Sequence, residues 1–315
     1  MLLKLALVLL GWGFWYALTL RLGATHFGLA LLTAMPLAAS FLVMMLGVMH
    51  DGSHGAASEH RAINRLAQGM LVIAGGSAVS WHQEHVVRHH AHTNVLGRDN
   101  DLETGGLLRF HPGQPWRPFH RYQHWYAWLL YGLVSFKWAW FEDLDDVLAD
   151  RFSLPPRRRL LHLAEAVVAK ASHFSIFLVV PALAWGWSRA AVFYVIHFFL
   201  VGLGMATTFV LAHVSGVQAM PRAREELPRD WALFQLATSA NFATGNRLLA
   251  WLIGGLNYQV EHHLFPTVSH RHYPWIRPIV RRWTERQQAV YHEFPTVAAA
   301  LQAHFRHLAR LGAEP

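Results

Sequence analysis

The feature that most limits the fold of this chain is a set of long apolar runs. The run from Phe27 to Met49 contains no charged residue, and the run from Leu2 to Leu20 contains only Lys4. A helix of about 20 apolar residues crosses the roughly 30 Å hydrocarbon layer of a bilayer, so each run is long enough to span it. Two later runs, at about 163–187 and 190–212, have the same character. The sequence therefore predicts an all-α integral membrane protein with four transmembrane helices in two hairpins.

Two other apolar stretches are predicted not to cross. Leu66 to Ser80 is only fifteen residues long and contains three glycines, so a buried or re-entrant helix is expected there. Trp125 to Phe141 contains Lys137 among many Trp and Tyr residues, a composition typical of the membrane interface.

The overall composition agrees with a membrane protein. Hydrophobic residues make up 53% of the chain and charged residues 15%, with a mean hydropathy of +0.20. The net charge is +8, but the arginines are separated by apolar runs, which argues against nucleic acid and favours anionic lipid, an acidic protein or a phosphate-bearing substrate. The chain has no cysteine, which excludes disulfides, Cys-bound zinc and iron–sulfur clusters.

Three histidine clusters follow apolar runs. In the stretch 81–94, a helix would place His85 and His89 on one face and His90 about 100° around the axis. His50 and His54 have the same four-residue spacing, and an adjacent His pair follows Gln259 closely. Such spacing is typical of metal ligands on helices.

Distant ligands can bind one metal site only if they lie on the same side of the membrane. Four spans satisfy this condition, since even numbers of crossings separate the three clusters. The basic residues Arg157 to Arg159 adjoin a span, which indicates the cytoplasmic side. We therefore predict one membrane domain, residues 1–315, with cytoplasmic parts 50–162 and 213–315 forming a helical cap that holds a dimetal site.

The predicted ligands are eight imidazoles, more than one ion binds, so a site for two ions is expected. They are His50, His54, His85, His89, His90, His213, His262 and His263. Imidazole accepts Fe, Zn, Cu or Ni, so residue type alone leaves the metal open, although no His-Glu-x-x-His motif of a zinc protease occurs. Candidates for orienting the ligands are Asp51, Asp99, Asp101, Asn241, Gln259 and Glu261. His292, His304 and His307 are expected at the surface.

These motifs resemble the three histidine boxes of the membrane fatty acid desaturases. The matching segments are His50-Asp51-x-x-His54, His85-x-x-x-His89-His90 and Asn257-Tyr258-Gln259-Val260-Glu261-His262-His263. The resemblance implies a non-haem di-iron centre, O2 as oxidant and removal of two hydrogens from an unactivated acyl chain. It also implies an additional ligand at His213. Gln259, where many members have His, resembles the front-end, linoleoyl-type subset. His111-Pro112-Gly113-Gln114 is interpreted as a turn and not as the haem motif of a fused cytochrome b5 domain.

The predicted function is therefore O2-dependent desaturation that introduces a cis double bond into an acyl chain carried by CoA or a lipid. The resemblance further implies two iron ions and a separate electron donor of the ferredoxin or cytochrome b5 type. The spacing leaves open an alkane or lipid hydroxylase with similar boxes. A metal transporter or haem electron carrier is a remote alternative, since a transporter places its ligands near the middle of its spans.

Overall fold

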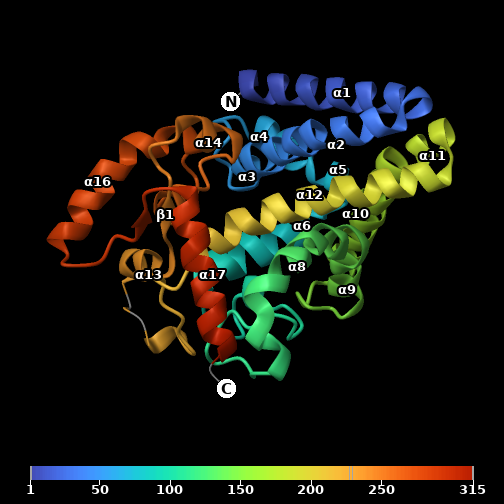
Figure 1. Cartoon of the computed structure of the whole chain (residues 1–315). Helices are drawn as coiled ribbons and strands as arrows, with labels where there is room; N and C mark the ends of the chain where they lie inside the picture. Colours follow the sequence, from blue (N-terminus) through green and yellow to red (C-terminus); the bar gives the residue numbers. More distant parts are fainter. Residues whose placement is uncertain (1, 227, 229, 314–315) are drawn as a thin grey trace. The chain divides into compact units, whose positions relative to one another are not determined.

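The computed structural model describes residues 2–226, 228 and 230–313, and these residues are mainly helical (Figure 1). The described strands are β1 (Asn241–Phe242) and β2 (Glu293–Phe294), which pair in parallel. The chain divides into two compact units. Unit 1 consists of Met1–Gln83 and Tyr131–Ala206, and unit 2 of Glu84–Leu130 and Thr207–Pro315.

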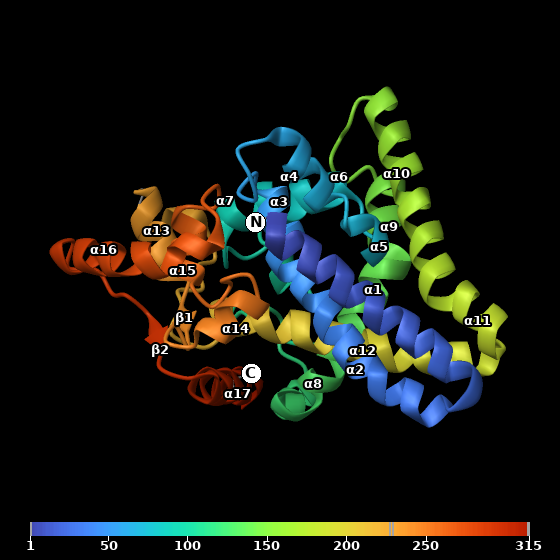
Figure 2. The ribbon, with the colours of Figure 1, turned by 90° about the horizontal axis from the view of Figure 1, so that it is seen from above.

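Four helices are long and apolar enough to cross a membrane, as predicted. They are Leu2–Thr25, Phe27–Ser53, Pro156–Trp185 and Trp187–His213. The first is α1; the second comprises α2 (Phe27–Leu42), η1 (Val43–Met49) and α3 (His50–Ser53); the third comprises α10 (Pro156–Phe174), η6 (Ser175–Val179) and α11 (Val180–Trp185); the fourth is α12. Figure 2 shows α1 and α2 side by side in unit 1.

The helix ends differ from the predicted ends for identifiable reasons. Helix α1 continues through Arg21 to Thr25, because Arg, Leu and Ala favour helices, and only His26 leaves the helical conformation. Helix α10 begins at Pro156, before the apolar part, since proline suits the first helical position. Apolar composition predicts where a helix can be buried in lipid, whereas these local residues decide where it begins and ends.

The segment predicted to be buried or re-entrant is broken into short helices. These are α4 (Arg61–Gln68), α5 (Leu71–Ala74) and α6 (Ala78–Trp81). Helix α5 ends at Gly75, whose φ of +80° is in the left-handed region that favours glycine. The Nζ atom of Lys170 donates to the carbonyls of Gly75 and Trp138 and pairs with Asp143 Oδ2 at 2.6 Å. This buried ammonium group holds the turn in place.

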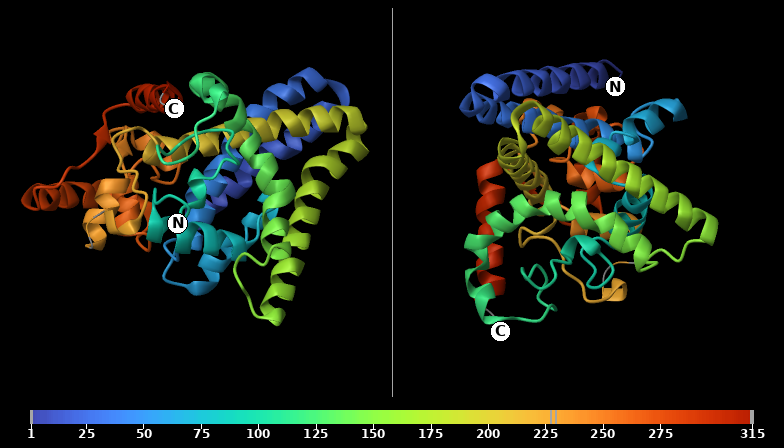
Figure 3. Two further views of the ribbon diagram at one scale, coloured as in Figure 1. Left: turned by 90° about the horizontal axis from the view of Figure 1, so that it is seen from below. Right: turned by 90° about the vertical axis from the view of Figure 1, so that its right-hand side faces the viewer.

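The aromatic stretch forms α8 (Gln123–Lys137), followed by η5 (Trp138–Glu142) and α9 (Asp143–Leu148). It is not among the four helices long and apolar enough to span. Within unit 1 it crosses α12 closely: a Cβ atom added to Gly202 would lie 2.6 Å from the carbonyl oxygen of Gly132. Small residues at such a crossing let two helix backbones approach, which is common in membrane proteins. Figure 3 shows the ribbon from two further sides.

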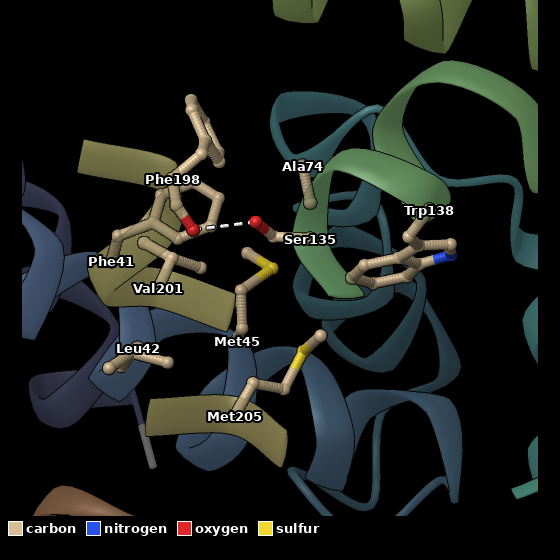
Figure 4. A pocket seen from close by; sticks show the side chains of 9 residues that line it. All are labelled: Phe41, Leu42, Met45, Ala74, Ser135, Trp138, Phe198, Val201 and Met205. Atoms are coloured by element: carbon tan, nitrogen blue, oxygen red, sulfur yellow. Dashed lines mark hydrogen bonds between the residues drawn. The ribbon is translucent and has the colours of Figure 1, made fainter. Parts of the chain in front are cut away.

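Unit 1 contains a small apolar cavity between several of these helices (Figure 4). Its volume is about 10 Å³. Ser135 Oγ donates a hydrogen bond of 2.6 Å to the carbonyl of Phe198 at its wall. The lining residues are Phe41, Leu42, Met45, Ala74, Ser135, Trp138, Phe198, Val201 and Met205. The wall is therefore apolar, because its one hydroxyl is already bonded to backbone.

Unit 2 packs its helices around apolar clusters. The first joins α13 (Trp231–Thr238), α15 (Gln259–Leu264) and α16 (Tyr273–Arg286) through Leu236, Val260, Leu264 and Val280. The second packs α17 (Val297–Ala313) against the end of α12 and β1. The remaining elements of unit 2 are α7 (His90–His92), η3 (Asn100–Leu102), η4 (Pro118–Tyr122), η7 (Arg224–Glu226), α14 (Arg247–Leu252) and η8 (His270–His272), with η2 (His82–His89) starting at the unit boundary.

The expectation that His304 and His307 lie at the surface is wrong. Both are buried on the inner face of α17, and His304 Nδ1 donates to the carbonyl of Val214. Burial lowers the pKa of each to about 4, so both are neutral. Because these two polar residues interrupt the apolar face of α17, the composition of the segment does not indicate that this face is buried.

Candidate metal centre

The second histidine cluster lies on a π-helical segment, η2, which continues into α7. A π-helix closes with i→i+5 hydrogen bonds, so residues five apart are brought toward one face. This places His90 beside His85, with ring centroids 5.0 Å apart, whereas an α-helix would place it about 140° around the axis from His85. The rings of His85 and His89 stack 5.4 Å apart. Three imidazoles from one helix therefore converge.

His89 meets His213 and His263, which come from the end of α12 and from α15. Their ligating nitrogens all lie within 4.8 Å of one another, and all three side chains are buried. The ring centroids are 4.8 Å apart for His89 and His213, 5.1 Å for His89 and His263, and 4.8 Å for His213 and His263. Residues far apart in the sequence thus form one compact trio, as predicted for ligands of a metal.

Hydrogen bonds fix the proton position on each ring of this trio. His89 Nδ1 lies 3.1 Å from Asp99 Oδ1, His213 Nδ1 lies 3.2 Å from the carbonyl of Thr238, and His263 Nδ1 lies 2.8 Å from Gln235 Oε1. Each of these oxygens accepts, because Gln235 directs its Nε2 to the carbonyl of His90. Each Nδ1 must therefore donate, which leaves the Nε2 lone pair as the ligating atom.

The Nε2 atoms of His89 and His263 are buried and have no hydrogen-bond partner among the described residues. A buried acceptor without a partner is costly, so it indicates an atom that is absent from the polypeptide. The third, His213 Nε2, lies 2.9 Å from the carboxamide nitrogen of Gln259. An imidazole trio with oriented Nδ1–H groups and closely spaced ligating nitrogens fits a transition-metal ion, which would displace a proton from Nε2 on binding.

A second group of histidines shares His263 with the trio. Together the two groups offer more nitrogen ligands than one metal ion binds. The ligating nitrogens of His90, His262 and His263 lie within 4.8 Å of one another. His90 Nε2 is 3.1 Å from His262 Nε2, and His262 Nδ1 is 3.2 Å from the hydroxyl of Tyr273. The ligating nitrogens of His85 and His262 also lie within 4.8 Å. Unit 2 therefore brings six of the eight predicted ligands together.

The other two predicted ligands, His50 and His54, belong to unit 1. They lie at the end of the second spanning helix, both buried, with ring centroids 4.8 Å apart. The ring of Trp81 lies 6.2 Å from that of His50. Unit 1 therefore carries one preformed pair of imidazoles, as the first motif predicts.

The predicted supporting residues fall into two groups. Asp99 and Asp101 contact His89 directly, at 3.1 Å each, and Gln259 contacts His213. Asn241 instead accepts from the backbone amide of Val260 in α15 at 2.9 Å and donates to the carboxylate of Glu261 at 2.8 Å. Asp51 is buried in unit 1. Through these hydrogen bonds, Asn241 and Glu261 position the helix of the third motif and not its imidazole rings.

Electrostatics distinguishes His89 from His263. Burial lowers the pKa of His89, but the carboxylates of Asp99 and Asp101 outweigh it and raise the pKa to about 9. Burial and the neighbouring imidazoles instead lower the pKa of His263 well below its usual value. Burial raises the pKa of Glu261 to about 7, against the hydrogen bonds from Tyr291 and Asn241. The carboxylates beside His89 therefore stabilise one positive charge at this site. A bound cation would take the place of the extra proton on His89.

Two contacts were missed by sequence reasoning. Gln235, which orients His263, is the one amide residue inside the apolar helix α13. Tyr273, buried beside His262, follows the third motif by ten residues. A lone amide in an apolar helix is a usable signal, whereas nothing in the local pattern around Tyr273 marks its hydroxyl.

The comparisons with known proteins agree with this geometry. A family model described as fatty acid desaturase matches residues 25–295. The chain belongs to the fatty acid desaturase family. The desaturase is therefore an oxidoreductase and a membrane protein, and its three histidine clusters all lie within the matched region.

Several desaturases match most of this chain. It is 32% identical to the sn-1 linoleoyl-lipid 6-desaturase of Arthrospira platensis over 278 residues, covering 85% of this chain and 74% of the relative. It is 32% identical to the protein of that name from Synechocystis sp. over 294 residues, covering 91% and 81%. It is 33% identical to the acyl-lipid (7-3)-desaturase of Rebecca salina over 314 residues, covering 95% and 68%.

Proposed function

We propose that this desaturase uses O2 and two iron ions to introduce a cis double bond into an acyl chain carried by a membrane lipid. The observation that carries the proposal is the buried trio His89, His213 and His263, whose Nδ1 atoms donate and whose Nε2 atoms converge. The relatives support a lipid-bound acyl chain over acyl-CoA, since their names specify linoleoyl-lipid and acyl-lipid substrates.

We assign all eight predicted histidines as iron ligands. Within unit 2, His89, His213 and His263 would hold one iron, and His85, His90 and His262 would bind the other. His50 and His54 of unit 1 are assigned as ligands from their sequence motif. We also propose that residues 1–315 form one functional domain. An all-imidazole set with acidic and amide partners on the outer nitrogens suits Fe²⁺, and when bound the irons supply the O2 chemistry.

The electron balance requires a donor. Reduction of O2 to two water molecules takes four electrons and four protons. Removing two hydrogens from adjacent carbons supplies two of each, so two electrons and two protons come from elsewhere. Since the chain has no cysteine to hold an iron–sulfur cluster, we propose a separate carrier of the ferredoxin or cytochrome b5 type as the electron source.

We propose that the histidine motifs face the cytoplasm. Two spans precede the second motif and four precede the third, so even numbers of crossings put both on the side where the N-terminus begins. Arg157 and Arg158 are exposed at the start of the third spanning helix, as expected next to a cytoplasmic surface.

The apolar cavity of unit 1 is our candidate for the far end of the acyl chain. Met45 lines it and lies five residues before His50 on the same continuous helix, less than about 8 Å along its axis. The cavity's small volume of about 10 Å³ would limit how much chain fits beyond the reacting carbons.

Expression in a host supplied with defined acyl chains tests the proposal. Gas chromatography and mass spectrometry of fatty acid methyl esters should show a product two mass units lighter than its precursor, first in the membrane-lipid fraction. A product sixteen units heavier would instead indicate the hydroxylase alternative. A product that appears first on CoA would contradict the lipid-bound substrate.

A further inference from the structure

Helix α16 has two faces with different neighbours. Its inner face, with Tyr273, Ile276 and Val280, packs on α13 and α15. Its outer face is exposed and carries Trp275, Ile279, Arg282 and Arg286, preceded four residues before Trp275 by Arg271. Trp275 is 63% exposed and Ile279 59% exposed. We call these five residues the α16 outer face; α16 is labelled in Figure 1.

The outer face is strongly basic. Glu285, the one acidic residue in α16, faces Arg281 at 3.6 Å, not Arg282 or Arg286. Trp and Arg are the residue types that contribute most to protein–protein binding, and an apolar centre with a charged rim is the usual arrangement of such an interface. The charge is complementary to an acidic protein.

A bilayer is a poorer occupant for this helix. A helix that lies on a membrane inserts a continuous apolar stripe. The apolar stripe of α16 is already covered, since Val280 is buried and Ile276 and Trp283 pack against the same cluster. The exposed apolar residues of α16 are Pro274, Trp275, Pro278 and Ile279, which are confined to its first two turns, with Arg271 before them and Arg282 after them.

The same helix also contacts the candidate metal centre. The hydroxyl of Tyr273, in its first turn, lies 3.2 Å from His262 Nδ1. Trp275 lies two residues farther on, and its ring is 5.6 Å from that of His272. A partner on the outer face would therefore be about one helix diameter, roughly 10–12 Å, from the hydroxyl that touches His262.

We propose that the α16 outer face is the docking surface for an acidic one-electron carrier protein. This rests on the proposed function, since the carrier supplies the two electrons that the acyl chain does not. The carrier is oxidised by one electron per encounter, and two encounters reduce the site that contains His262 for each double bond formed. The arginines hold the carrier's acidic rim, and Trp275 and Ile279 cover the apolar margin of its redox group.

The test measures binding directly on the full chain in nanodiscs. The probes are an acidic [2Fe–2S] ferredoxin and the soluble haem domain of cytochrome b5, and the variant is Arg282→Glu with Arg286→Glu. We expect the dissociation constant of the better probe to rise at least about tenfold at low ionic strength, with a weaker dependence on salt. Trp275→Ala should weaken binding without changing the salt dependence.

A charge-matched control is Arg121→Glu with Arg306→Glu, two exposed arginines of the same unit on η4 and α17. Unchanged binding by the α16 variant, or equal weakening by the control, would overturn the proposal. So would an α16 variant that alters only the KM for the acyl substrate, because the face would then serve that substrate.

A second measurement separates this proposal from the proposed function. With a small chemical reductant in place of the carrier, the α16 variant should form product at the wild-type rate. If the wild type forms no product with any reductant, the desaturase proposal fails, whereas the binding comparison still decides the docking surface.

Discussion

Two groups of buried polar side chains in this protein differ in which of their polar atoms have no hydrogen-bond partner. Lys170 in unit 1 directs its ammonium group to three acceptors, the carbonyls of Gly75 and Trp138 and the carboxylate of Asp143. His89 and His263 in unit 2 use Nδ1 in hydrogen bonds, but their Nε2 atoms have no partner among the described residues. The ammonium group of Lys170 has all its acceptors within the polypeptide, although Asp143 Oδ1 also lacks a partner among the described residues. What distinguishes the second group is that its ligating nitrogens, with that of His213, lie within 4.8 Å of one another, as a shared ligand requires. Burial of polar groups alone does not separate a structural network from a metal site.

The largest effect should follow removal of an unpartnered nitrogen. His263→Ala should reduce double-bond formation below detection, because it removes a nitrogen shared by both groups of ligands. The protein should still accumulate in the membrane, since no intact hydrogen-bond network of the spans is broken. Methyl ester analysis and immunoblotting of membranes measure the two quantities. Product formation by this variant would remove His263 from the site.

Removal of Lys170 should have the opposite pattern. Lys170→Met leaves Asp143 buried without its cation, and breaking such a pair by removing one partner costs about 3–5 kcal/mol. Thermal unfolding in detergent should occur at a clearly lower temperature, while iron per folded chain stays unchanged. Lys170→Arg is the matched control that retains the charge. A Lys170→Met protein of normal stability with reduced iron would show that Lys170 supports the metal site and not the fold.

Asp99 and Asp101 offer a matched pair of smaller changes. Both carboxylates lie 3.1 Å from His89 Nδ1, but the side chain of Asp99 is 1% exposed and that of Asp101 50% exposed. Loss of an outer hydrogen-bond partner typically reduces metal affinity about 10–100-fold. We expect Asp99→Asn to reach that range and Asp101→Asn to stay well below it, since solvent screens the exposed group. Competition with a chelator measures both affinities, and equal losses would show that burial is not the deciding factor.

The smallest predicted effect concerns the cavity of unit 1. Met45→Ala should enlarge the cavity and shift the preferred acyl chain toward longer substrates by a few-fold, with total activity largely retained. Paired feeding with chains that differ by two carbons measures the ratio. Met70→Ala, a methionine outside the cavity lining, is the control. An unchanged ratio would place the end of the acyl chain elsewhere.

The sequence predicts the spanning helices and the histidine motifs, but it does not predict contacts that depend on how the helices pack. Apolar runs reveal four spanning helices because lipid imposes a minimum length on them. Helix i,i+4 spacing reveals His85 with His89, but it cannot reveal the π-helical segment that brings His90 beside them, since both helix types suit the same residues. Gln235 and Tyr273 reach the histidines only through the packing of α13 and α16. The burial of His304 and His307 likewise depends on where α17 packs.

The most direct test of the central claim is iron content per chain, measured by plasma mass spectrometry on protein purified after expression with iron. We expect two irons per chain in the wild type, fewer in His89→Ala and His213→Ala, and an unchanged value in the Lys170→Arg control. A wild-type protein that forms product without iron, or that holds the same iron after both histidines are replaced, would contradict it.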